Sequence, residues 1–553
     1  MAFGELKNRL QNMAYGSRVY QNMLRGGKSH AAVAELHVVP ADVWPAQAAL
    51  GQHYLAYDFG LGVPSGADEP SLLADPRQTP PLDIRVHDFG WLRDLRVLGG
   101  DEARRRARQL VTAWLDRFAN WDEVAWALPP LGARVANALA MHDFYAASAG
   151  DDFRARLFET LGSHVRHLGL ALPANVQGYA FVQAMKGLIF GSVCLPGLDS
   201  YFDKAIALFL GRLDSLLGQD GFCRERSPRV QLLMLRDLVD IRNLLGQSGL
   251  AVPQALTAAI DQMAPALRFI SHGDGGLALF HGGDEGLPVL IESVLTQTST
   301  RARKRVALPD SGYEKIQSNR SLLLVDAGLP PPPGFDTTAH AGLAAFEFSS
   351  GRERIIVNCG ALDRPSPAWR QALAATAAHS TLTVQDTNAL EVMNEGVGDR
   401  PTIFEVERDD HEGFSRLIIT HNAYAGTAQL VHRRLLQLSK DGLTLHGEEQ
   451  LRGALGASFA VRFHLHPSVQ VSLIQDGRAA LLKLPSGQGW RLRCQPHVLV
   501  LASSIYAGDA RLGANNAVYG SGAAQVRPTK QLVIEGKMSQ DVVDLAWSLI
   551  REG

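Results

Sequence analysis

The chain has 553 residues, of which 46% are hydrophobic and 20% are charged, and its formal net charge at pH 7 is −2. This length predicts two or three domains with cores of their own. A net charge so close to zero produces no general electrostatic field around the chain, so we expect no nucleic-acid partner. A polyanionic ligand would have to bind in a local basic cleft.

The N-terminal segment, up to His30, lacks the apolar core of a secretory signal, and no run reaches the roughly 18 apolar residues of a membrane-spanning helix. Its basic residues are interleaved with Leu, Met and Tyr, which is typical of a solvated helix or of a basic amphipathic helix at a membrane surface: Lys7, Arg9, Arg18, Arg25 and Lys28. The four cysteines form no C-x-x-C pair, which favours free thiols. We therefore expect a cytoplasmic protein, with peripheral membrane contact as an open alternative.

Residues up to about 300 are expected to be helical. In 101–120, Asp101 can cap a helix whose apolar residues follow at helical spacing. Similar patterns, separated by Pro and Gly, recur at 131–147, 151–169, 177–193, 199–217, 227–247 and 253–270. Many helices of medium length with short connections predict a bundle, solenoid or toroid built from helical hairpins.

After about residue 305 the spacing of the apolar residues changes from the helical pattern to the pattern of β-strands. Short apolar runs alternate with turns such as "SSGR", "SKDG" and "QDGR". The clearest runs are "SLLLVDA", "LAAFEFS", "RIIVNCG", "STLTVQD", "SFAVRFHLH" and "KQLVIEG". They predict a large antiparallel β-sandwich. The expected domains are a helical domain at 1–305 and a β-sandwich domain at 306–553.

Two Gly-rich segments precede this change of period, at His272–Gly276 ("HGDGG") and His281–Gly286 ("HGGDEG"). No strand–turn–helix frame surrounds them, so they do not indicate a nucleotide site. They are either ordinary turns or a loop whose histidine and carboxylates face a cleft at the domain junction.

Three local motifs resemble the heparinase II/III-like polysaccharide lyase superfamily. They are "VHDFGWLRDL" (Val86–Leu95), "DGFCRERSP" (Asp220–Pro228), and "AHAGLAAFEFSSGRERIIVNCG" (Ala339–Gly360) with the following "AHSTL" (Ala378–Leu382). The last is the most specific, because spacing and strand pattern agree together. The resemblance covers nearly the whole chain. It implies an N-terminal incomplete (α/α) toroid followed by a C-terminal antiparallel β-sandwich.

The resemblance also implies a structural zinc at the base of the catalytic cleft. The family's ligands are a histidine, an aspartate and a second histidine, which correspond here to His340, Asn358 and His379. A neutral amide oxygen is a poorer zinc ligand than a carboxylate, so an aspartate at 358 is expected to bind the metal more tightly. In the alternative, the two histidines hydrogen-bond to Asn358 and brace the strands without metal.

The family's chemistry is β-elimination beside a uronate carboxylate. This reaction needs a neutralised carboxylate, a base for the C5 proton and an acid for the leaving oxygen. The family's usual residues are replaced at several places. Its Asn-His pair becomes Tyr179-Ala180, its Tyr-His pair becomes Val230-Gln231, and the first His and the Asp of H-x-H-x-D become Thr338 and Gly342.

The polar residues that remain near those positions are the candidates for catalysis: Arg226, Tyr179, Tyr313, His340 and Gln231. Arg226 is expected to neutralise the carboxylate through a two-bond contact. Tyr179 or Tyr313 is expected to act as base or acid, with a pKa depressed by the arginines. Alternatively, Arg224 and Arg226 form a charged helix start that pairs with nearby carboxylates.

The candidates for substrate binding are Arg224, Trp91, Trp126, Trp369 and His464. A tryptophan can stack on a sugar ring, although core packing accounts for a tryptophan equally well. In "VRFHLHP" the strand alternation places His464 and His466 on one face, where they line a polyanion groove or form a polar rim of the sandwich.

These patterns together predict a lyase-like protein that cleaves or binds a uronate-containing acidic polysaccharide or oligosaccharide, by β-elimination if it is catalytic. One alternative is a non-catalytic glycan-binding protein on the same fold. Another is a uronate epimerase, or a glycoside hydrolase, which needs two opposed carboxylates. The only carboxylates available for that role are Glu225, Asp274, Asp284 and Glu285.

Overall fold

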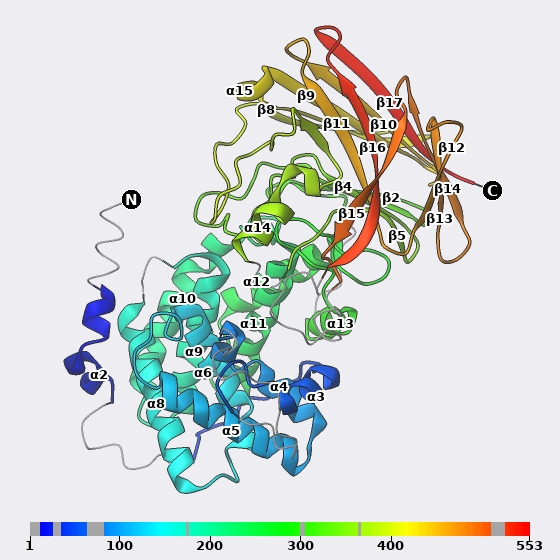
Figure 1. Cartoon of the computed structure of the whole chain (residues 1–553). Helices are drawn as coiled ribbons and strands as arrows, with labels where there is room; N and C mark the ends of the chain where they lie inside the picture. Colours follow the sequence, from blue (N-terminus) through cyan, green and yellow to red (C-terminus); the bar gives the residue numbers. More distant parts are fainter. Residues whose placement is uncertain are drawn as a thin grey trace. The chain divides into compact units, whose positions relative to one another are not determined.

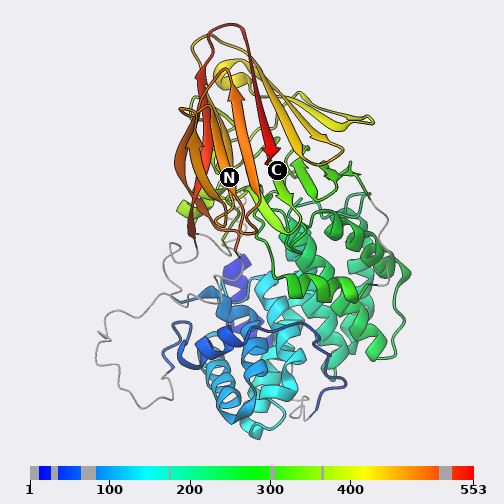
Figure 2. The same cartoon turned by 90° about the vertical axis from the view of Figure 1, so that its right-hand side faces the viewer.

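The structure is a computed structural model that describes residues 11–25, 35–63, 82–172, 176–298, 305–362, 366–509 and 526–552. It confirms the predicted order of a helical part and an antiparallel β part (Figures 1 and 2). The chain forms two compact units, which we describe separately. The helical unit is Met1–Leu216 with Arg236–Ile260, and the β unit is Leu217–Leu235 with Asp261–Gly553.

The helical unit consists of helices of medium length joined by short loops, as the Pro and Gly residues between the apolar patterns predict. In chain order these are α2 (Arg18–Arg25), α3 (Ala48–Ala56), η1 (Ile84–Asp88), α4 (Trp91–Leu98), α5 (Gly100–Phe118), α6 (Leu128–Ala140), α7 (His142–Tyr145), α8 (Asp151–Ala171), α9 (Gly178–Cys194), η2 (Asp199–Tyr201) and α10 (Phe202–Leu216). Two further helices, α11 (Pro228–Gln247) and α12 (Gln254–Phe269), contribute to both units. None of the described helices is both long and apolar enough to cross a membrane.

Helices α6 and α9 pack closely at the centre of the helical unit because glycines face each other there. A Cβ atom at Gly132 would lie 2.2 Å from the carbonyl oxygen of Gln183, and one at Gly187 would lie 2.4 Å from the Cα of Gly132. A larger residue at either position would force the two backbones apart, so this contact fixes the crossing of the two helices.

In the β unit the described strands form two antiparallel sheets. The first has the order β1-β2-β3-β4-β5-β11-β16-β15, with β6 also paired to β11, and the second has the order β12-β13-β14-β17-β10-β9-β8-β7. The strands of the first sheet are β1 (Ala307–Leu308), β2 (Tyr313–Ser318), β3 (Ser321–Asp326), β4 (Phe346–Ser350), β5 (Glu353–Val357), β6 (Leu382–Val384), β11 (Ser458–Leu465), β15 (Leu499–Tyr506) and β16 (Arg527–Lys537).

The strands of the second sheet are β7 (Phe404–Asp410), β8 (Phe414–Tyr424), β9 (Leu430–Ser439), β10 (Thr444–Arg452), β12 (Gln470–Ile474), β13 (Ala479–Lys483), β14 (Gly489–Gln495) and β17 (Val542–Arg551). Short helices in this unit are α13 (Pro288–Thr296), α14 (Pro367–Ala374), η3 (Thr376–Ala378) and α15 (Ala425–Ala428).

Aromatic side chains of both sheets meet in the core of the sandwich. Phe346 of β4 stacks on Trp547 of β17 with ring centroids 5.7 Å apart, and Phe463 of β11 meets the same indole edge-on at 4.9 Å. All three side chains are buried. The alternation of apolar residues along each strand therefore produces the packed core that it predicts.

A buried ion pair lies beside this core. Arg434 of β9 and Glu449 of β10 are fully buried and their charged atoms lie 2.8 Å apart. Trp547 donates its indole N–H to Glu449 at 3.2 Å, and Arg434 also donates to the carbonyl oxygens of Ala344 (2.8 Å) and Ser380 (3.1 Å). Arg434 thus fixes the backbone at Ala344 and Ser380, which are close in sequence to His340 and His379 of the candidate site.

The carboxyl group of Glu449 depends on its partners to remain charged. Burial alone would raise its pKa, but Arg434 and His432, which lies 2.6 Å away, lower it from an ordinary 4.5 to about 2. The stability that this ionised group contributes is therefore present above about pH 4.5 and is lost as the pH falls toward 2.

We predict that Glu449→Gln destabilises the protein by about 3–5 kcal/mol, because it leaves the buried Arg434 charge uncompensated. The measurement is the urea unfolding midpoint at neutral pH and again between pH 5 and 3, where the variant should lose less additional stability than the parent. Glu448→Gln, on the exposed face of the same strand, is the matched control and should change little. Equal midpoints for the parent and Glu449→Gln would contradict the assignment.

Candidate functional site

Arg226 lies just before α11 and its guanidinium points into the β unit, not toward open solvent. The side chain is 5% exposed. It forms an ion pair with Asp326 at the end of β3, and it donates to the carbonyl oxygens of Ser311 (2.5 Å) and Leu329. Burial would lower the pKa of Arg226, but Asp326 raises it, so the guanidinium stays charged. The predicted role of neutralising a substrate carboxylate needs correction, because Asp326 already occupies that guanidinium.

Three histidines extend from Asp326 through the buried part of the site. The Nε2 atom of His281 lies 2.9 Å from the Asp326 carboxylate, and its Nδ1 atom accepts the backbone N–H of His340 at 3.2 Å. His340 Nδ1 and His379 Nε2 are 3.0 Å apart, and His379 Nδ1 donates to the carbonyl oxygen of Ala375 at 2.9 Å. This last bond makes His379 Nε2 the acceptor and His340 the donor.

Burial keeps these histidines neutral. It lowers the pKa of His340 well below the usual range, with His379 adding to the effect, and it lowers the pKa of His379 to about 4. The pKa of His281 is lowered as well, again mainly by burial. His340 is buried and its Nδ1 atom already donates to His379, so this arrangement does not favour His340 as the base of an elimination.

The residues at the expected zinc position do not fit a zinc ion. Asn358 is fully buried, its Oδ1 accepts the backbone N–H of Ser380 at 2.9 Å, and its Nδ2 donates to Glu347 Oε1 at 3.1 Å. The amide oxygen and nitrogen are thus both engaged with protein partners, and of the three expected ligands only His340 and His379 contact each other. Within the described ranges, no group of three or more His, Cys, Asp or Glu side chains is arranged to hold a metal.

The metal-free alternative also needs correction in its details. The two histidines hydrogen-bond to each other, and Asn358 binds the backbone of the residue after His379 instead of either ring. Glu347 explains why an amide stands at 358. Its Oε1 also accepts the Asn358 backbone N–H at 3.0 Å, and its Oε2 lies 2.9 Å from His272.

Tyr313 and Gln231 hold the loop that carries Arg226. The Tyr313 hydroxyl donates to the Arg226 carbonyl oxygen, and burial raises the pKa of Tyr313 well above its usual value. Gln231 accepts the backbone N–H of Cys223 at 2.7 Å and donates to Gly221 (2.9 Å) and Met263 (3.0 Å). The expected depression of the tyrosine pKa by arginine is wrong, because desolvation outweighs the charge of Arg226.

Tyr179 belongs to the helical unit, whereas Arg226, Tyr313, Gln231 and His340 belong to the β unit. Its hydroxyl donates to Asp237 at 2.9 Å. Burial opposes ionisation of Asp237, but the ammonium of Lys186, 2.9 Å away, and Arg236 lower the pKa of Asp237 to about 2. This cluster of buried charges ties α9 to α11.

Three of the predicted sugar-binding side chains have no free face or free ring nitrogen. Trp91 and Trp126 are 3% and 1% exposed in the core of the helical unit. His464 is 2% exposed, with one ring nitrogen on Ser504 (2.7 Å) and the other on the carbonyl oxygen of Ala377 (3.0 Å). Trp369, on α14, is half-buried against a small apolar cluster that includes Leu373.

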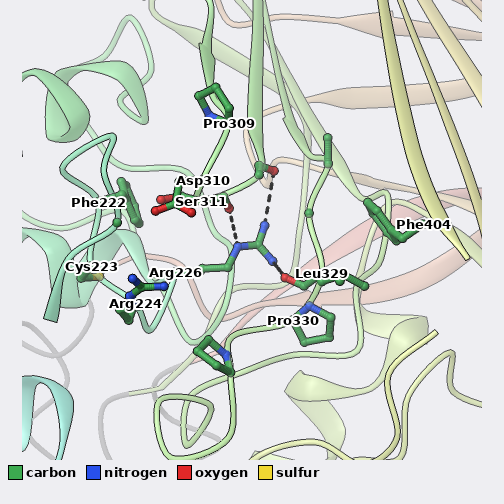
Figure 3. A pocket seen from close by; sticks show the side chains of 15 residues that line it. Phe222, Cys223, Arg224, Arg226, Pro309, Asp310, Ser311, Leu329, Pro330 and Phe404 are labelled. Atoms are coloured by element: carbon green, nitrogen blue, oxygen red, sulfur yellow. Dashed lines mark hydrogen bonds between the residues drawn. The ribbon is translucent and has the colours of Figure 1, made fainter. Parts of the chain in front are cut away.

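Arg224 differs from these residues. It is half-buried and lines a pocket of about 330 Å³ in the β unit, together with Phe222, Leu329, Pro330 and Phe404. Among the residues that the structure describes, no hydrogen-bond or ion-pair partner faces its guanidinium. Figure 3 shows Arg226 joined by dashed lines to Ser311 and Leu329, with Arg224 beside Cys223 and Phe404 across the view.

Sequence reasoning missed Asp326 and the role of His281. Asp326 directly follows the apolar run of β3, so only its position at a strand end could have drawn attention to it. The segment of His281 is predicted to be an ordinary turn or a loop whose histidine faces a cleft, and the structure gives His281 a left-handed backbone with φ 43°. Such a conformation is uncommon for a residue with a side chain, but sequence does not reveal it.

The fold defines a class: a helical part of (α/α)-toroid type and an antiparallel β-sandwich, an arrangement seen in solved structures of polysaccharide lyases. Heparinase III has this fold (TM-score 0.70, 10% identity, 96% of this chain and 89% of that one). So does a mutant of the heparan sulfate lyase HepC from Pedobacter heparinus (TM-score 0.60, 14% identity, 96% and 87%). Likenesses at such low identity concern the fold alone.

Residues 300–548 match the family model described as "Heparinase II/III-like, C-terminal". A relative named FtsZ-localized protein C, from Caulobacter vibrioides, is 32% identical over 479 residues, which are 82% of this chain and 82% of that protein. The chain belongs to the heparinase II/III-like family.

We predict that Asn358→Asp destabilises the protein instead of creating a zinc site. The substitution removes the amide donor and sets a second carboxylate against the buried Glu347, which should cost at least about 2 kcal/mol. The measurements are the unfolding midpoint and the zinc content after purification without chelator.

Asn388→Asp is the matched control, because exposed Asn388 uses only its oxygen, which accepts the Thr376 backbone N–H at 2.9 Å. An aspartate keeps that acceptor, so its midpoint should not change. One equivalent of zinc in Asn358→Asp, with unchanged stability, would contradict the prediction.

Proposed function

We propose that this protein binds an acidic polysaccharide or oligosaccharide on a polysaccharide-lyase fold and does not cleave it. The observation that carries this proposal is the position of Arg226. The residue expected to neutralise a uronate carboxylate is buried and already neutralises Asp326. A substrate carboxylate would have to displace a buried ion pair, and each separated charge would then lose its partner at high cost.

Two of the groups expected to take part in the other steps of β-elimination are engaged elsewhere. The hydroxyl of Tyr313 is committed to the Arg226 carbonyl oxygen, and burial holds its proton. Gln231 has no titratable proton and is fully buried. Neither residue can serve as the base or the acid that the reaction needs.

The support for an acidic ligand is the fold, together with Arg224, whose guanidinium has no partner among the described residues. Arg224 lines an open pocket and carries a guanidinium suited to a carboxylate. Uronate-containing glycans supply such carboxylates at regular intervals. β-Elimination of the same glycans remains the alternative activity, and the test below separates the two.

We predict that the protein produces no unsaturated product from alginate, glycosaminoglycan or bacterial exopolysaccharide fragments. β-Elimination creates a double bond conjugated to the carboxylate, so ultraviolet absorbance follows it directly, and a reducing-end assay detects hydrolysis. Binding to at least one of these glycans should be measurable by calorimetry and should weaken with salt. Growth of absorbance that His340→Ala abolishes would establish a lyase and overturn the proposal.

A second proposal concerns where the protein works. A relative at 32% identity is named for its localisation with FtsZ, and we infer that this chain also gathers at FtsZ, on the cytoplasmic side of the membrane. Peripheral membrane contact has one supporting observation. On α2, Val19 and Met23 are 81% and 53% exposed, one helical turn apart.

We predict that a fluorescent fusion follows FtsZ in dividing cells. Val19→Asp combined with Met23→Asp should reduce sedimentation of the purified protein with anionic vesicles, because each change removes apolar contact and adds repulsion. Val252→Asp, at an exposed valine between α11 and α12, is the control. A diffuse fusion would contradict the localisation, and unchanged sedimentation would contradict membrane contact through α2.

A further inference from the structure

We propose that the Arg224 pocket binds an extended peptide of a partner protein, in which an acidic residue and a neighbouring apolar residue enter the pocket. This binding goes beyond the proposed recognition of a glycan. The pocket, of about 330 Å³, lies wholly in the β unit and reaches the lower end of the sizes usual for ligand sites.

The walls of the pocket suit an apolar group beside a carboxylate. Phe222, Phe404, Leu329 and several prolines form one part of the lining, and Arg224 adds a guanidinium that has no partner among the described residues. Arg226 contributes little attraction, because Asp326 compensates its charge.

Two polar side chains of the lining are already hydrogen-bonded within the β unit. Ser311 Oγ donates to Asp220 at 2.7 Å, and Asp310 accepts the backbone N–H of Gln219 at 2.7 Å. Arg224 is therefore the side chain of the lining that we assign to the acidic residue of the peptide.

The rim of the pocket is already ordered. Arg226 donates to the carbonyl oxygen of Leu329, and Arg400 donates to that of Pro331, so both guanidinium groups hold the run of prolines that follows β3. Proline fixes its own φ angle, which reduces the entropy lost when a ligand binds.

A strand edge explains why the ligand is a peptide and not a free acid. Phe404 lines the pocket and is also the first residue of β7, the last strand of its sheet. Within the described part of the chain, β7 pairs with β8 only, so its other edge offers backbone donors and acceptors to an added strand.

Charge along β7 specifies the rest of the peptide. Glu405 and Glu407 are exposed and two residues apart, so their side chains share one face of the strand. A peptide that lies on this edge should therefore carry basic residues at alternate positions beyond its acidic and apolar pair. Acidic residues also discourage edge-to-edge association of copies of this chain, which leaves the edge accessible.

The test uses the full-length protein and synthetic peptides that contain Asp-Leu followed by Thr-Lys-Thr-Lys, together with the reversed order. Matched peptides replace Asp with Asn, or both Lys with Glu. We expect binding of the first set by fluorescence anisotropy, weakened roughly 10- to 100-fold by the Asn replacement or by Arg224→Gln, since each removes one charge-assisted contact. Glu405→Gln with Glu407→Gln should reduce the salt dependence of binding.

Arg433→Gln is the matched control, because Arg433 is a half-buried arginine that lines a different pocket, on β9. It should leave peptide affinity unchanged, and Arg224→Gln should unfold at the parental urea concentration. Failure to bind any peptide, equal binding of the Asn peptides, or unaltered affinity of Arg224→Gln would overturn the proposal.

An oligoglucuronate serves as the competing ligand. If it binds and loses affinity in Arg224→Gln while the peptides do not bind, the pocket is a glycan subsite and the peptide proposal fails alone. If peptides bind through Arg224 and no glycan binds anywhere, the peptide proposal stands and the proposed glycan binding fails.

Discussion

The buried ion pair between Arg226 and Asp326 is the interaction on which the candidate site depends. Through Arg226 it fixes the loop before α11, the backbone after Pro309 and the proline run after β3. Through Asp326 it orients His281, which in turn receives the backbone N–H of His340. Removing either charge would leave the other buried without compensation, so neither residue is free to serve a substrate.

A buried pair of this kind is weak evidence for net stability. The desolvation of both charges offsets much of their attraction, and several backbone carbonyl groups complete the shell around Arg226. Its value lies in selecting one arrangement of three separate segments. The binding role that we propose requires a rigid wall beside the pocket, and this ion pair supplies it.

The change from helical to strand periodicity was sufficient to predict the fold class, because burial on one face imposes those periods directly. The candidate site was harder to predict for a physical reason. The identity of Arg226 does not reveal whether its charge meets a substrate or Asp326, which is 100 residues away in the sequence. Trp91 and Trp126 show the same ambiguity, since an indole serves a core and a sugar site equally well. The sequence shows that an asparagine at 358 is unusual. The partner that accounts for this asparagine is Glu347, which comes close to Asn358 only when the strands fold.

The backbone at Arg226 explains how one short motif supplies two arginines with different roles. Arg226 has φ 53°, a left-handed conformation that a residue with a side chain adopts only when its surroundings compensate the strain. Here Tyr313 binds the Arg226 carbonyl oxygen, and its ring lies 4.9 Å from the guanidinium carbon. The reversal of the chain at this residue buries Arg226 and leaves Arg224, two residues earlier, at the pocket wall. Arg226 thus holds the pocket wall in place, and Arg224 gives the pocket its positive charge.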